Sequence, residues 1–92
     1  MKSKTTFDSV WEALEDDPIR VRNLKLRSEL LMRIADELGN RELTQVQAAR
    51  LLHITQPRVS ALMRGKIENF RLDSLVDFAH RLGLRVSLEV AA

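Results

Sequence analysis

The sequence predicts an all-α fold with one β-strand at its C-terminal end, and three observations lead to this prediction. Apolar residues recur three and four positions apart over much of the chain, which is the period of an amphipathic helix. Residues 44–65 carry the caps of two short helices joined by a tight turn. At residues 84–90 the apolar period changes to two, which is typical of a half-buried strand.

The length of the chain, 92 residues, allows one small domain. We expect an acidic N-terminal segment at 1–17, a helical body at 18–83 and a dimerisation strand at 84–92. Because a chain of this length has only a thin core, dimerisation would add stability. The absence of cysteine excludes disulfides and thiolate metal sites. Neither a signal peptide nor an apolar run of about 20 residues is visible, so we expect a cytoplasmic protein without membrane contact.

The N-terminal segment should contain an amphipathic helix with acidic surroundings. Its apolar stripe follows the spacing i, i+3, i+4 and i+7. The stripe consists of Phe7, Val10, Trp11 and Leu14. Residues 1–17 contain two lysines and five acidic residues. Two interpretations stay open: the stripe packs on the body of the protein, or the segment docks a basic partner protein. The contact residues in the second case would be Phe7, Trp11, Glu12 and Glu15.

A longer helix is predicted from Pro18 to Leu38, with Asp17 as its N-cap. Asn23 is expected to mark a break near its start, and the pair Gly39-Asn40 to end it. The early turns carry a basic cluster, which is either a solvated face or a contact for a DNA backbone or an acidic surface. This cluster consists of Arg20, Arg22, Lys25 and Arg27.

The two short helices that follow are the most distinctive feature of the chain. Thr44 and Gln47 have the spacing of a capping box, Thr55 can cap the second helix, and Gly65 can end it. The residues between the two predicted helices, His53 and Ile54, are too few for anything but a turn. This is the pattern of a helix-turn-helix, whose second helix enters the major groove of DNA.

The outward face of the second short helix is suited to DNA. It presents hydrogen-bonding and cationic groups without a carboxylate, from Thr55, Gln56, Arg58, Ser60 and Arg64. Residues 44–71 hold five cations and one acidic residue, as the neutralisation of phosphates requires. Gln56 is placed to bind an adenine edge. The alternative is an ordinary solvated helical hairpin, although such hairpins usually mix both charge signs.

The last third of the chain is predicted to hold a loop, a helix and the strand. The loop spans Lys66–Arg71, and helical spacing continues over residues 72–82. A lone strand at 84–90 would leave its backbone donors and acceptors unpaired, so it needs a partner. The simplest partner is the same strand of a second subunit, and the alternative is the segment Lys4–Phe7. The side chains on the dimer face would be Leu84, Val86, Leu88 and Val90.

No constellation of residues for catalysis or metal binding is visible. His53 and His80 are too far apart in sequence for a metal motif, and three glycines provide no phosphate-cradling loop. We therefore expect neither an enzyme nor a metal, a cofactor or a small-molecule ligand.

The motif resembles the helix-turn-helix of the Cro/C1 (XRE-type) repressor family over about residues 24–82. Gln45 and Gln56 match the glutamines that begin the two motif helices in that family. Core and terminator positions match at Val59, Leu62 and Gly65. His53 departs from the family, which usually has glycine at this turn. If the turn requires a positive φ, His53 must adopt it at some energetic cost.

This resemblance implies a lambda-repressor-like helical domain that binds a palindromic operator in double-stranded DNA as a homodimer. It also implies that one glutamine contacts a phosphate and the other an adenine, and that Lys66 and Arg71 lie near phosphates and the minor groove. The residues predicted to bind DNA are Gln45, Thr55, Gln56, Pro57, Arg58, Ser60, Arg64, Lys66 and Arg71.

Shorter matches, at residues 10–15, 26–30 and 56–66, are similar to HigA-like antitoxins of type II toxin–antitoxin modules. The similarity implies a repressor of its own operon that also neutralises a HigB-like mRNA endonuclease, a small basic protein. A stand-alone phage-type dimeric regulator is the alternative, and an interaction module that binds no DNA is a third hypothesis. The acidic N-terminal segment favours the antitoxin, since a bare repressor does not need it.

Overall fold

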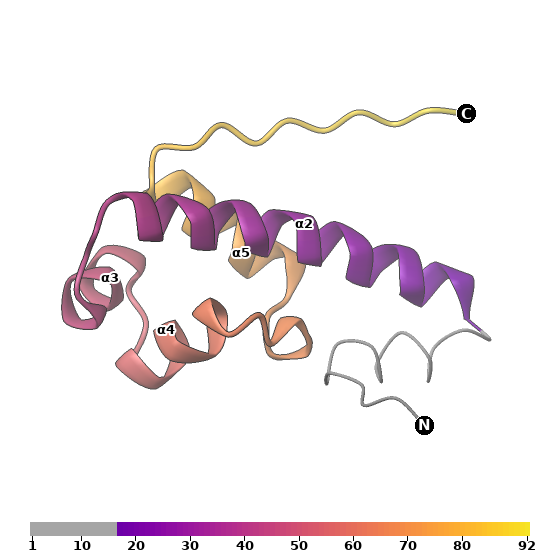
Figure 1. The fold of residues 1–92 in the computed structure, drawn as a ribbon. Coiled ribbons are helices and arrows are strands. Elements are labelled where there is room, and N and C mark those ends of the chain that lie inside the picture. Colours follow the sequence, from indigo (N-terminus) through magenta and orange to yellow (C-terminus); the bar gives the residue numbers. More distant parts are fainter. Residues whose placement is uncertain (1–16) are drawn as a thin grey trace, which may run out of the picture.

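The computed structural model describes residues 17–92, and within this range the regular elements are all helical. Figure 1 shows α2 running along the body with α5 beside it, while α3 and α4 lie together on one side. The elements are α2 (Pro18–Asn40), α3 (Gln45–Leu52), α4 (Gln56–Met63), the 3₁₀ helix η1 (Ile67–Asn69) and α5 (Leu72–Arg81). The all-α prediction is thus confirmed for these residues. The helix predicted around Phe7–Leu14 lies outside the described range.

Helix α2 begins as predicted but is longer and continuous. The Asp17 carboxylate accepts a hydrogen bond from the Arg20 N–H at 3.2 Å, which confirms the predicted N-cap. The predicted break at Asn23 is wrong: the helix continues through it, and the Asn23 side chain accepts a hydrogen bond from Arg27 Nε at 2.9 Å. Past the helix end, the left-handed conformation falls on Glu42, with φ 54°, and not on a glycine.

The core lies where α2 and α5 meet the helix-turn-helix pair. Phe70 and Phe78 pack edge to face within it, with ring centroids 6.2 Å apart. The buried residues are Leu24, Leu31, Ile34, Leu38, Ala48, Ala49, Leu52, Val59, Leu62, Ile67, Phe70, Leu75, Phe78, Ala79 and Leu82. Because all are apolar, burial of hydrophobic surface is the main stabilising term for this domain.

The segment predicted as a plain loop, Lys66–Arg71, contributes to the core. It forms η1, and its two apolar side chains, Ile67 and Phe70, are 2% and 0% exposed. Two arginines hold the segment from opposite elements: Arg27 donates to the Phe70 carbonyl at 3.1 Å and Arg58 to the Asn69 carbonyl at 3.2 Å. These bonds satisfy carbonyls that a short 3₁₀ turn cannot pair by itself.

The predicted C-terminal strand is not formed in the single chain. The Leu84 N–H donates to the Ala79 carbonyl at 2.9 Å, and beyond it the segment is extended without a strand ladder among residues 17–92. It runs beside α2, on the side away from α3 and α4 (Figure 1). A strand needs a partner edge, and this all-helical range offers none. The alternative partner, Lys4–Phe7, lies outside the described residues.

The unexpected burial of Phe70 gives a stability prediction. Replacing Phe70 by Ala should lower the free energy of unfolding by about 3–5 kcal/mol, because the substitution leaves a cavity in the centre of the core. Met32 provides a matched control: its side chain is 60% exposed, so Met32→Ala should cost less than about 1 kcal/mol. Urea unfolding followed by circular dichroism measures both values, and equal losses would show that Phe70 is not a core residue.

Candidate nucleic-acid interface

Helix α3 is fixed at its start by the predicted capping box. The Thr44 hydroxyl accepts a hydrogen bond from the Gln47 N–H at 3.1 Å, and the Gln47 side chain accepts one from the Thr44 N–H at 2.9 Å. Both bonds satisfy backbone donors that an open helix end would leave free. The helix buries Ala48, Ala49 and Leu52 and leaves Gln45 exposed at its first position.

The turn between α3 and α4 adopts a left-handed conformation, although it has His53 at the position where the family that the motif resembles usually has glycine. His53 has φ 60° and ψ 44°, in the left-handed region, and the Ile54 N–H returns to the Ala49 carbonyl at 3.0 Å. His53 Nε2 also lies 3.3 Å from an Arg81 guanidinium nitrogen. Because a guanidinium has no acceptor, Nε2 accepts this bond, which links the turn to the end of α5.

Helix α4 stands on the core with its N-terminal end exposed. The Thr55 hydroxyl accepts a hydrogen bond from the Arg58 N–H at 3.3 Å, and Pro57 occupies the first turn, as predicted. Val59 and Leu62 are buried beneath it. On the outward side Thr55, Gln56, Pro57 and Arg64 are exposed, and Ser60 is half-buried.

Arg58 does not point away from the body, in contrast to our expectation. Its guanidinium carbon lies 4.5 Å from the centre of the Phe70 ring, and the group donates to the Asn69 carbonyl. This cation–π contact and the hydrogen bond explain why the side chain is half-buried. In this position Arg58 connects α4 with the segment that follows it.

The surface around α4 is cationic. The sequence from Thr44 to Ile67 contains no aspartate or glutamate, and Arg50 and Arg64 are exposed along it. Lys66, half-buried, and Arg71, exposed, follow on the η1 side. This surface offers amide, hydroxyl and guanidinium groups, and Glu68 on η1 is the one exposed carboxylate among residues 44–71, so the balance suits a phosphate backbone and base edges.

The other predicted contact residues lie elsewhere or outside the described range. Leu84 is half-buried against the core, whereas the apolar side chains beyond it, Val86, Leu88 and Val90, are exposed. The residues assigned to a toxin contact, Phe7, Trp11, Glu12 and Glu15, precede residue 17 and are not described. Residues 17–92 contain no cluster of three side chains suited to hold a metal ion. In the same range no helix has the length and apolarity needed to cross a membrane.

The packed helix pair, its left-handed turn and the exposed end of α4 define a protein of the helix-turn-helix class. In agreement, the model of a family described as helix-turn-helix domain matches residues 13–91. This match spans most of the chain, so the chain belongs to that family. Helix-turn-helix domains insert their second helix into DNA, so membership indicates a DNA-binding regulator. No curated protein matches the chain.

The strained turn leads to a prediction at His53. Only glycine adopts a left-handed conformation without cost, so His53→Val, which adds a β-branched side chain there, should lower stability by about 1–2 kcal/mol. His53→Gly should be neutral or stabilising by up to about 1 kcal/mol, since the lost bond to Arg81 is at the surface. Urea denaturation distinguishes the two variants. Equal destabilisation by both would mean that the side chain of His53 matters more than its backbone conformation.

Proposed function

We propose that this protein is a sequence-specific transcriptional repressor that binds a palindromic operator as a homodimer. One observation carries the proposal: the outward end of α4 is exposed and free of carboxylates, on a helix pair whose inner face is firmly buried. Selection of bound duplexes from a random-sequence pool tests the proposal directly. Enrichment of a two-fold symmetric site supports it, and no enrichment over the input pool contradicts it.

The residues divide into those that read bases and those that hold the backbone. Gln56, exposed at the first position of α4, can bond in a bidentate manner to N6 and N7 of adenine. Gln45, at the first position of α3, is proposed to contact a phosphate of the DNA backbone. The remaining proposed contacts, to phosphates or along the groove edge, come from Thr55, Pro57, Ser60, Arg64, Lys66 and Arg71. Arg58 makes no direct contact with DNA in this proposal, and it supports η1 by donating to the Asn69 carbonyl.

The base-reading role predicts the effect of Gln56→Ala. This variant should lose about 1–3 kcal/mol at the selected site and tolerate other bases at the contacted position. Lys66→Ala should instead weaken binding to every sequence. It should also reduce the slope of log affinity against log salt concentration by about 1. Fluorescence anisotropy over a salt series measures both effects. Asn40→Ala removes an exposed amide outside the motif and serves as the control. Unchanged affinity and base preference for Gln56→Ala would contradict this docking.

The proposed homodimer uses the C-terminal segment. A groove lined by apolar residues of α2, α5 and this segment includes Leu26, Val76, Val86 and Leu88. It lies away from α3 and α4, so a second copy there would leave both DNA-facing surfaces free (Figure 1). Pairing of residues 84–90 with their two-fold copy would satisfy their backbone groups. The two α4 helices should then lie about one DNA turn apart, roughly 34–36 Å.

Leu88 gives the sharpest test of this interface. Its side chain is 88% exposed in the single chain, so Leu88→Lys should leave the fold intact. Burying the new charge in a dimer would be unfavourable, so the variant should be monomeric and bind only half-sites weakly. Glu89→Lys, on the opposite side of the extended segment, should remain dimeric. Light scattering at micromolar concentration reads both outcomes, and a monomeric parent protein would exclude the proposed dimer.

A narrower proposal is that this repressor is the antitoxin of a toxin–antitoxin module in the cytoplasm. The similarity to HigA-like antitoxins and the acidic, Trp-containing segment at 1–17 support it. A nuclease that grips mRNA must carry a basic surface, so an acidic segment would attract it and speed association. A stand-alone regulator without a toxin partner is the second candidate.

Deletion of residues 1–16 separates these ideas. If the segment docks a toxin, the truncated protein should keep its fold, its dimeric state and its affinity for DNA, but should no longer protect cells from the toxin. Growth rescue and co-purification with the product of the adjacent reading frame measure this. A large fall in melting temperature would show that Trp11 belongs to the core instead. Full protection by a stably folded truncation would place the toxin contact on another surface.

A further inference from the structure

We propose that Arg27 and Arg71 bind a phosphate of the DNA backbone in a pocket outside the helix-turn-helix. This inference rests on the DNA-binding function proposed above and adds a contact from α2, which the motif itself does not include. The occupant is a phosphodiester group of the strand that flanks the site read by α4.

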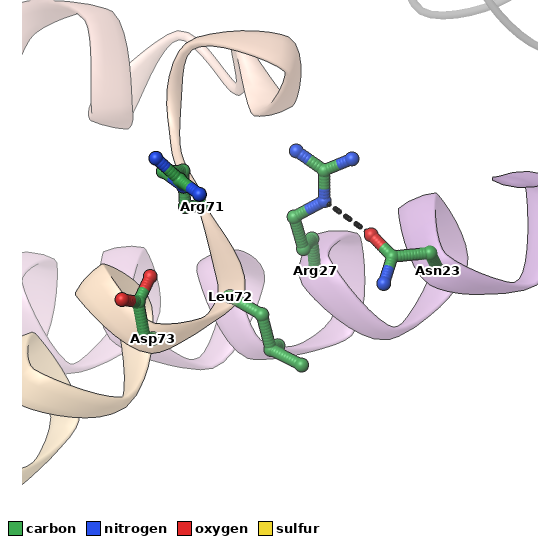
Figure 2. A pocket seen from close by; sticks show the side chains of 5 residues that line it. All are labelled: Asn23, Arg27, Arg71, Leu72 and Asp73. Carbon is green, nitrogen blue, oxygen red and sulfur yellow. Dashed lines mark hydrogen bonds between the residues drawn. The ribbon is translucent and has the colours of Figure 1, made fainter.

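The pocket lies between α2 and the start of α5. It has a volume of about 340 Å³ and is lined by Asn23, Arg27, Arg71, Leu72 and Asp73. Figure 2 shows Arg27 on α2 and Arg71 before the start of α5 bordering the pocket, with Asp73 below Arg71. Two guanidinium groups that border one polar pocket are a suitable arrangement for an anion with several acceptor oxygens.

Arg27 is already held in place for such a contact. Its Nε donates to the Asn23 side chain at 2.9 Å, and one terminal nitrogen donates to the Phe70 carbonyl at 3.1 Å. A guanidinium has five donors, so these two bonds leave others for a ligand. Because the side chain is fixed before binding, less conformational entropy is lost when a phosphate arrives.

The charges of the pocket favour an anion despite one carboxylate. Arg27 and Arg71 contribute two positive charges and Asp73 one negative charge. The Asp73 carboxylate accepts a hydrogen bond from the Ser74 N–H at 2.9 Å, so the α5 backbone partly compensates its negative charge. The first turn of α5 has no side-chain cap, so its positive dipole end adds to the local potential. The net field is therefore attractive to phosphate, and Asp73 weakens it.

The pocket is also connected to α4. Arg58 of α4 holds the Asn69 carbonyl and Arg27 of α2 holds the next carbonyl, that of Phe70. Arg71 follows directly, so both pocket arginines are tied to the segment that leaves the proposed DNA-reading helix. Lys66, another proposed phosphate contact, lies in the same segment five residues before Arg71.

The test compares two duplexes that carry the selected site. One extends roughly 10 base pairs, about one helical turn, beyond the site on each side, and the other ends at the site. On the long duplex Arg27→Gln should lower the slope of log affinity against log salt by about 1, as expected for one lost phosphate contact. On the short duplex the change should be smaller. Arg22→Gln removes the same charge from the exposed surface of α2 outside the pocket and should leave the slope unchanged.

A second pair of variants excludes a purely structural role of Arg27. Asp73→Asn should raise affinity for the long duplex several-fold at low salt, because it removes the repelling charge from the pocket. Asp77→Asn removes an equal charge from α5 outside the pocket and should have little effect. If the parent protein binds the duplex but Arg27→Gln keeps its slope, or Asp73→Asn behaves like Asp77→Asn, this inference is overturned. If the parent protein binds no duplex at all, the proposed function fails and this site falls with it.

Discussion

The packing of α3 against α4 through small and branched side chains is the constraint on which the rest depends. Ala48 and Ala49 present short side chains, and Val59 and Leu62 of α4 are buried with them. This close approach requires the chain to reverse within two residues, which places His53 in the left-handed region. The same reversal leaves Thr55 and Gln56 exposed at the start of α4. Core packing and the proposed DNA-reading surface thus have a common local origin.

Arginine serves this domain in two ways. Eleven of the fifteen cationic residues are arginine, and the sequence alone suggested that those near the motif neutralise phosphates. The structure shows that several also donate to backbone carbonyls of other elements: Arg27 to Phe70, Arg58 to Asn69, and Arg41 to Leu82. A guanidinium can make such bonds at a partly exposed site while its apolar stem packs below. In a small domain, these bonds fix backbone carbonyls at the ends of η1 and α5.

Local features of the fold could be predicted, and contacts between distant residues could not. The caps at Asp17, Thr44 and Thr55 depend on neighbours three residues away, so their spacing was sufficient. The positive φ at His53 was expected only on the condition that the turn needs one, because the family that the motif resembles usually has glycine there, and the structure shows that His53 adopts it. The burial of Phe70 and the inward position of Arg58 depend on each other across twelve positions, which no periodicity reveals. The strand at 84–90 could not form because backbone pairing needs an edge that residues 17–92 do not supply.

The central claim is that the exposed start of α4 and the first position of α3 face DNA. The exposed face of α2 that includes Met32 should not face DNA. Backbone amide chemical shifts, recorded by NMR during titration with the selected duplex, test this most directly. The account predicts large shifts at Gln45, Thr55, Gln56 and Arg64, and small shifts at Met32 and Asp36, which are exposed on α2. Shifts concentrated on α2 with none at the start of α4 would contradict it.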